Sequence, residues 1–249
     1  MKRFATHDVA LAHVILLTSR VYADVLTPFL LADNPAITVL QLVHPNQIND
    51  LPDDYLLASR LISFGTRYYI PASLLERIGY GSYNFHPGPT TYPGWAPFLY
   101  AIYEGAHTYG VTVHEMSPKI DAGKIIAVTD FDMPPNITPQ KLVDLTTDHM
   151  VALFKTLSAS FVNHTNYLPN IPVQWQKTPN RKRDFAAICA LPLDIDEAEL
   201  KRRIFAFGDS DGEVFPHLMV EGKRYRLAFE DDHPDRYSHW LHGIRFVVE

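Results

Sequence analysis

An asparagine and a histidine stand two residues apart at the end of an apolar run, within Asn84-Phe85-His86-Pro87-Gly88. Residues 79–85 predict a β-strand, and a Pro- and Gly-rich loop, residues 87–94, follows it. Residues i and i+2 of a strand share a face, so we expect Asn84 and His86 to lie side by side. An imidazole can move a proton near neutral pH, and a carboxamide can donate a hydrogen bond to a developing oxyanion. The pair suits acyl transfer, although the spacing alone also fits a strand end that carries two polar residues.

The motifs around this pair resemble those of the N10-formyltetrahydrofolate-dependent formyltransferases. That family carries an Asn-x-His strand end, a Pro-rich loop, a Gly-Val-Thr strand and an Asp-x-Gly turn. This chain has them in the same order, as residues 84–86, 87–94, 110–112 and 121–123. The basic residue that precedes the loop's final glycine in the family is replaced here by Pro93.

The resemblance implies roles for individual residues. Asn84, His86 and Asp121 are expected to be catalytic, with Asp121 beside the imidazole, where a carboxylate favours the charged form. The positions expected to bind N10-formyltetrahydrofolate lie in two loops: Gly65, Tyr69, Ile70, Lys119, Ile120 and Gly123. Tyr92 and Trp95 are expected to border the entrance for the acceptor. No metal is expected to take part.

Apolar runs and amphipathic stretches alternate along the chain, and these elements must position the motifs. Strands are predicted at residues 13–18, 37–43, 59–64, 79–85, 109–116 and 124–131. Helices are predicted at residues 19–31, 94–105 and from Thr138-Pro139 to about residue 165. This alternation indicates an α/β fold, a Rossmann-like, open, mostly parallel sheet as in the formyltransferase fold, with its ligand beyond the carboxyl ends of the strands.

The chain is expected to divide into a catalytic domain, residues 1–165, and a small α+β C-terminal extension, residues 166–249. The extension should hold a helix at 194–207 and a β-hairpin of residues 217–220 and 224–229. The polar stretch 163–183 is interpreted as a solvated linker, with contact to an anionic acceptor as the alternative.

Composition excludes several classes of function. The 249 residues carry a net charge of −6, which argues against a nucleic-acid surface. Cys189 is the single cysteine, as is typical of a reducing compartment. Residues 1–17 resemble a secretory signal, but His7 and Asp8 precede the apolar run and no small-residue cleavage site follows. With no run of about 20 apolar residues for a membrane span, a cytoplasmic protein without membrane contact is expected.

Cofactor motifs other than those for folate are missing from the sequence. No Gly-x-Gly-x-x-Gly follows the first strand, so a dinucleotide cofactor is not expected. His107, His114 and Glu115 form the rival constellation, a metal site, but the second histidine of a metal-binding helix motif is missing. The other histidines are interpreted as surface or packing residues.

The expected activity is formyl transfer from N10-formyltetrahydrofolate to the amine of a nucleotide-linked amino sugar, in surface polysaccharide biosynthesis. Family members that act on initiator tRNA carry an additional barrel domain, whereas the tail of this chain is similar to that of sugar-formylating members. Two alternatives stay open: a hydrolase that releases formate, and a catalytically silent folate-binding protein. The expected partners are the sugar nucleotide and the folate, and a homodimer is the candidate assembly.

Overall fold

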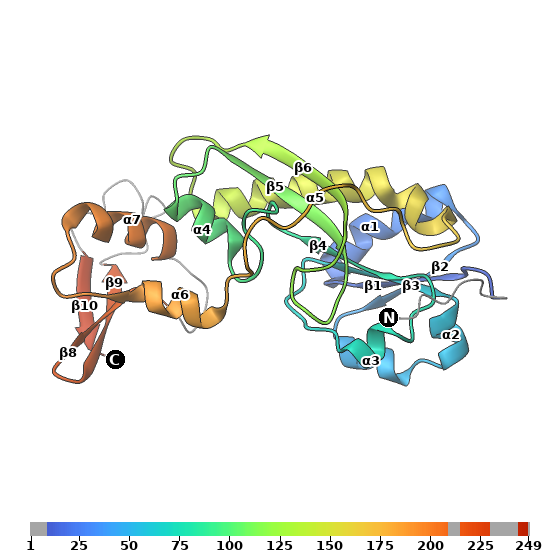
Figure 1. Cartoon of the computed structure of the whole chain (residues 1–249), viewed down its shortest axis with the longest axis horizontal. Coiled ribbons are helices and arrows are strands. Elements are labelled where there is room, and N and C mark those ends of the chain that lie inside the picture. Colours follow the sequence, from blue (N-terminus) through green and yellow to red (C-terminus); the bar gives the residue numbers. More distant parts are fainter. Residues whose placement is uncertain (1–8, 209–214, 230–243, 249) are drawn as a thin grey trace. The chain divides into compact units, whose positions relative to one another are not determined.

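The structure is a computed structural model, and its residues 9–208, 215–229 and 244–248 are described (Figure 1). The chain forms two compact units. The first comprises Met1–Pro93, Gly110–Phe131 and Leu145–Thr178, and the second comprises Gly94–Tyr109, Asp132–Asp144 and Pro179–Glu249. The division into domains at residue 165 stays a prediction.

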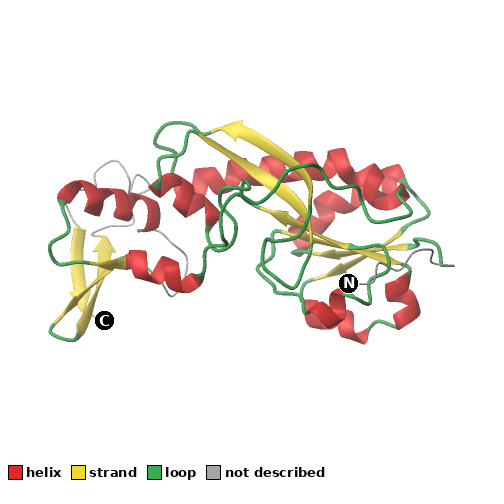
Figure 2. Cartoon of the chain, in the orientation of Figure 1, coloured by secondary structure: helices red, strands yellow, loops and turns green. Residues whose placement is uncertain are grey.

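A six-stranded sheet with the order β2-β1-β3-β4-β5-β6 organises the first unit (Figure 2). Its strands are β1 (His13–Leu17), β2 (Thr38–Leu42), β3 (Ser59–Phe64), β4 (Ser82–His86), β5 (Thr108–Glu115) and β6 (Ile125–Asp132). Strands β1 to β4 pair in parallel, and β5 pairs antiparallel with β4. The predicted open, mostly parallel sheet is therefore confirmed. The strand predicted to begin at residue 79 begins at 82, because residues 79 and 80 form a turn and Gly81 after it has φ 85°.

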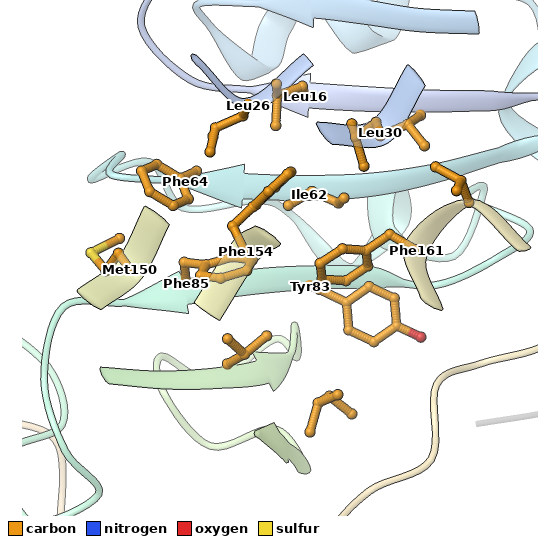
Figure 3. Close-up of a cluster of buried hydrophobic side chains, with 14 of the residues drawn as sticks. Leu16, Leu26, Leu30, Ile62, Phe64, Tyr83, Phe85, Met150, Phe154 and Phe161 are labelled. Atoms are coloured by element: carbon orange, nitrogen blue, oxygen red, sulfur yellow. The ribbon is translucent and has the colours of Figure 1, made fainter. Parts of the chain in front are cut away.

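Helices cover both faces of this sheet because every second strand residue points to the opposite side. The helices of this unit are α1 (Arg20–Asp33), the 3-10 helix η1 (Pro45–Asp50), α2 (Asp53–Leu57), α3 (Ala72–Leu75) and, from Leu145 onward, α5 (Pro139–Asn163). Phe64 and Phe85 from the strands pack with Leu26 of α1 and Phe154 of α5 on one face (Figure 3). Residues of η1, α2 and α3 cover the other face at β1 and β3.

The end of α5 is tied to the sheet through Arg60 of β3, a fully buried arginine. Its guanidinium donates to the carbonyl oxygens of Ser160 (3.0 Å), Phe161 and His164 (2.9 Å), and also to those of Tyr80 (3.0 Å) and Asn166 (2.7 Å). The last four carbonyls of a helix have no partner inside the helix. Arg60 therefore acts as a buried cap for the end of α5.

The described residues of the second unit form a sheet with the order β10-β9-β8-β7 and several helices. Its elements are α4 (Pro97–Tyr103), α6 (Lys182–Cys189), β7 (Ala190–Leu191), α7 (Glu197–Phe207), β8 (His217–Val220), β9 (Lys223–Phe229) and β10 (Ile244–Val248). The rings of Tyr100, Phe185 and Phe207 pack together in its core. The helix and hairpin predicted for the tail are present, and α6 begins inside the stretch that was predicted to be a linker. None of the helices in the described ranges is long and apolar enough to cross a bilayer.

Candidate active site

Strands β4 and β5 deliver four polar side chains to one face of the sheet. Asn84 pairs with His114 and His86 pairs with Thr112 in the antiparallel register. Residues directly opposite each other in such a pair share a face. The intervening Phe85 points into the hydrophobic cluster on the other side. The predicted side-by-side placement of Asn84 and His86 at the carboxyl end of a strand follows from this geometry.

Asp121 reaches both histidines from the turn that follows β5. Its Oδ2 lies 3.2 Å from His86 Nδ1, and its Oδ1 lies 3.2 Å from His114 Nε2. The three residues are nearly closed to solvent, with His86 and His114 each 3% exposed and Asp121 8% exposed. Gly123 allows the turn to approach this closely, since a Cβ there would lie 1.6 Å from the Glu115 carbonyl oxygen.

The hydrogen-bond partners of the two imidazoles fix where their protons lie. His86 Nε2 lies 2.9 Å from the Tyr92 carbonyl oxygen, and His114 Nδ1 lies 2.9 Å from that of Glu115. A carbonyl oxygen only accepts, so each of these nitrogens must carry its hydrogen. In the neutral rings the remaining nitrogens then present lone pairs to the Asp121 carboxyl. The cluster of His86, Asp121 and His114 can therefore take up a proton at the carboxyl and share it with either imidazole.

The Asn84 side chain lies beside His114 in this cluster. Its Nδ2 lies 3.2 Å from His114 Nε2, so the amide donates to that lone pair. The amide nitrogen carries a second hydrogen, and the residue is only partly buried. That second hydrogen is available to a ligand beside the cluster.

Burial dominates the electrostatics of His86. Desolvation lowers the pKa of its imidazole below the ordinary value of 6.5, and the His114 imidazole lowers it further. The Asp121 carboxylate and the bond to the Tyr92 carbonyl oppose this shift by favouring the charged ring. The net lowering keeps His86 neutral at pH 7, ready to accept a proton.

The Pro-rich loop is held in place by a series of backbone carbonyls. Thr112 Oγ1 donates to the Gly88 carbonyl (2.9 Å), and the Tyr92 amide donates to that of Pro89 (3.0 Å). Tyr92 was predicted to border the acceptor, and that role stays a prediction. In the structure its ring is buried and its carbonyl oxygen orients His86.

The segment of residues 171–177 also reaches the cluster, so its interpretation as a solvated linker is wrong. Trp175 Nε1 donates to the Gly123 carbonyl oxygen (3.0 Å). Its ring lies edge-to-face against His86, with centroids 5.5 Å apart, and against His114, with centroids 5.2 Å apart. The contact of Trp175 with the cluster could not be predicted from the sequence, because a single aromatic residue between polar neighbours carries no periodic signal.

His114 is the second residue that the sequence analysis left out of the site. From the sequence it was named only in the rival metal constellation with His107 and Glu115. The signal was nevertheless present, because alternation along Gly110-Val-Thr-Val-His114 gives His114 the same face as Thr112. The antiparallel pairing of β4 and β5, which places it opposite Asn84, could not be read from the sequence.

The positions predicted to bind folate fall into two groups. Tyr69 (55% exposed) and Ile120 (60% exposed) present large apolar side chains to solvent, and Lys119 is exposed beside them. The Tyr69 hydroxyl lies 3.5 Å from the Pro118 carbonyl oxygen, which brings the two predicted loops together. Ile70, in contrast, is buried in the core cluster of η1, α2 and α3.

Two glycines complete the predicted folate set. Gly65, at the end of β3, has φ 62°, a conformation that glycine adopts without strain, and Gly123 lies in the Asp121 turn.

Trp95, predicted to contact the acceptor, belongs to the second unit. There its backbone amide donates to the Asn180 carbonyl oxygen (2.9 Å), and Lys182 lies over its ring.

Other chemistries find little support in the described part of the chain. There, no group of three or more His, Cys, Asp or Glu side chains is arranged to hold a metal ion. Burial raises the pKa of the Cys189 thiol to about 12, which makes it a poor nucleophile.

Comparison with known proteins matches this site to one family. Residues 62–156 match the formyl transferase family model. A methionyl-tRNA formyltransferase of Rickettsia bellii is 35% identical over 100 residues, which are 40% of this chain and 31% of that protein. A dTDP-4-amino-4,6-dideoxyglucose formyltransferase of Mycobacterium bovis is 38% identical over 68 residues, which are 27% of this chain and 28% of that protein. The matched part of this chain thus spans about a third of the length of each of these relatives.

Solved structures extend the likeness over most of the chain. A sugar N-formyltransferase of a Shewanella species superposes with a TM-score of 0.68 at 19% identity, covering 90% of this chain and 100% of that one. An N-formyltransferase of Helicobacter canadensis, crystallised with folinic acid and dTDP-3-aminofucose, superposes with a TM-score of 0.61 at 14% identity, covering 90% of each chain. The chain therefore has the formyltransferase fold, and its residues 62–156, which include Asn84, His86, His114 and Asp121, match the formyl transferase family model.

Proposed function

We propose that this protein is an N-formyltransferase that moves the formyl group of N10-formyltetrahydrofolate to an amine. One observation supports this function most directly: Asp121 lies within 3.2 Å of one ring nitrogen of each of two buried histidines. A carboxyl group beside two imidazoles can accept a proton, and the transfer requires a base, because the attacking amine must lose a proton.

The residues divide the reaction between them. The neutral amine attacks the formyl carbon, and the carbonyl oxygen becomes an oxyanion that the Asn84 amide stabilises by donating a hydrogen bond. The proton that the amine loses passes to the cluster of His86, Asp121 and His114. The bond from the formyl carbon to folate N10 then breaks, and the cluster returns the proton to N10. Atoms and charges balance without an oxidant or a metal.

The folate is proposed to lie against the loops that carry Gly65, Tyr69, Ile70, Lys119, Ile120 and Gly123. Tyr69 and Ile120 support this placement, because exposed apolar side chains beside a polar cluster suit a flat heterocycle. Folinic acid is present in the crystal structure of the Helicobacter relative, which has the same fold.

The acceptor is proposed to be the amine of a nucleotide-linked amino sugar. Two relatives, from Mycobacterium and Helicobacter, are associated by their descriptions with dTDP-linked amino sugars. The competing acceptor is methionyl-tRNA, the substrate named for the Rickettsia relative. The net charge of −6 favours the sugar, since binding of tRNA phosphates draws on basic surface.

The test is incubation with N10-formyltetrahydrofolate and each of a panel of acceptors, followed by mass spectrometry for a formyl increment. The panel holds dTDP- and UDP-linked amino sugars, methionyl-tRNA and water alone, with the Asp121→Asn variant as control. Formylation of an amino sugar that is lost in the variant supports the proposal. Formate without acceptor would identify a hydrolase, and formylation of methionyl-tRNA at matching rates would overturn the sugar acceptor. Folate binding with no turnover would indicate a silent binding protein.

A further inference from the structure

Trp175 contacts both imidazoles of the cluster and the turn that carries Asp121. Its indole N–H donates to the carbonyl of Gly123, two residues after Asp121. Its ring lies nearly perpendicular to both imidazoles, at 79° to His86 and 81° to His114. Edge-to-face arrangements at these distances are the favoured geometry for aromatic pairs.

The backbone around Trp175 is fastened at several further points, so the indole is not a loosely placed surface group. The Ile171 amide donates to the Ile125 carbonyl (2.9 Å), and the Gln176 amide donates to the Thr90 carbonyl (3.0 Å). Lys177 Nζ lies 4.9 Å from the centroid of the Tyr92 ring. We call residues 171–177 the strap, because they join the loop that carries Asp121 to the Pro-rich loop whose Tyr92 carbonyl orients His86.

We propose that Trp175 is a positioning residue, which holds the Asp121–Gly123 turn against the two imidazoles and shields the cluster from water. The effect of Trp175 on kcat rests on the proposed formyl transfer. Its effect on proton binding by the imidazoles does not depend on that function. The indole lies edge-to-face against both His86 and His114, which are nearly closed to solvent, and it is itself partly exposed. It therefore stands between the cluster and solvent.

Removal of the indole should change proton binding in a predictable direction. The charged or titratable groups that face His86 are the Asp121 carboxylate and the His114 imidazole, and burial outweighs them in lowering the pKa of His86. Admitting water would relieve that burial, which can shift a pKa by up to about 3–5 units for a fully buried group. The pKa of His86 should therefore rise.

The experiment compares Trp175→Leu, Trp175→Phe and the control Gln174→Ala, an exposed strap residue with no role in the cluster. Imidazole titrations are followed by NMR in the intact protein, with the signals of His86 and His114 assigned by their loss in His86→Gln and His114→Gln. Trp175→Leu should raise the pKa of His86 by about one unit or more, since burial is its main cause. Trp175→Phe keeps a ring but loses the bond to Gly123, so it should leave the pKa closer to that of the wild type.

The kinetic arm uses the acceptor that the panel identifies. Both Trp175 variants should lower kcat, by roughly 10-fold or more for Leu, with little change in KM, as expected for a group that positions catalytic residues. Gln174→Ala should match the wild type in both assays. Unchanged titrations in Trp175→Leu would overturn the inference, and if that variant does not fold, unchanged kcat in Trp175→Phe would do so. If no acceptor is formylated, the proposed function fails while the NMR comparison still decides the role of Trp175.

Discussion

His114 Nε2 lies 3.2 Å from Asp121 Oδ1, while the other oxygen of the same carboxyl faces His86. Asp121 is therefore shared between two imidazoles and does not belong to a single Asp–His pair. A shared carboxyl can pass a proton between two rings without moving either of them. Replacement of His86, Asp121 or His114 should therefore interrupt this proton transfer.

Replacement of Asp121 by Asn should lower kcat by roughly 10²-fold or more, the usual worth of a positioned acid–base group. The amide keeps the shape but offers no carboxylate between the imidazoles. His86→Ala should have an effect of similar size. Turnover is measured by mass spectrometry of the formylated acceptor, with folding checked by circular dichroism. Near wild-type turnover in either folded variant would contradict the assigned cluster.

Asn84→Ala should lower kcat by about 10²-fold while leaving KM nearly unchanged, because in the proposed reaction the amide donates to an oxyanion that exists only in the transition state. Initial rates at varied folate and acceptor concentrations separate the two parameters. A rise in KM alone would instead assign Asn84 to substrate binding.

Trp95→Ala should raise the KM of the acceptor more than that of the folate, and Ile120→Ala should do the reverse. The two variants are compared because each removes a large apolar side chain. Trp95 is predicted to contact the acceptor and Ile120 to contact the folate. Steady-state kinetics with each substrate varied in turn provides the measurement. The same KM pattern in both variants would show that one of the assignments is wrong.

The stability of the fold should fall as the pH drops below about 6.5, in part through His86. Burial holds the pKa of His86 below that of the unfolded chain, so between the two values the unfolded state binds more protons. The free energy of unfolding then rises with pH across this window and levels off above it. The free energy of unfolding is measured with urea at pH 5.5 and at pH 7.5. The difference between these two free energies should be smaller for His86→Gln than for the wild type. His107→Gln, at an exposed site, is the control and should keep the wild-type difference.

Arg60→Met should destabilise the first unit by about 3 kcal/mol or more, because it leaves several buried carbonyls without a donor. Arg60 donates to five backbone carbonyls, among them those at the end of α5. Arg77→Ala removes an exposed ion pair with Asp53 and should cost about 1 kcal/mol or less. Urea denaturation of both variants provides the comparison, and equal losses would contradict the capping role of Arg60.

The sequence predicted most of the fold because its signals are local. Apolar runs placed β3 at residues 59–64 without error, and Thr138-Pro139 marked the start of α5. Asn84 and His86 could be placed together because both lie on one strand. His114 and Trp175 could not, since their positions depend on the antiparallel register of β5 and on where residues 171–177 run. Such long-range pairing leaves no trace in the spacing of residues along the chain.

The backbone of Asp121 has φ 40°, in the left-handed region that few residues other than glycine, asparagine and aspartate adopt readily. This limits which replacements can survive at the position, whatever their chemistry. Glutamate would retain the charge but would strain the turn, and alanine would lose both the charge and the local fit. Asparagine is the one substitution that changes the charge alone. In a saturation library at residue 121, folded but inactive variants should therefore be dominated by asparagine and glycine, while the remaining variants should lose the geometry of the turn itself.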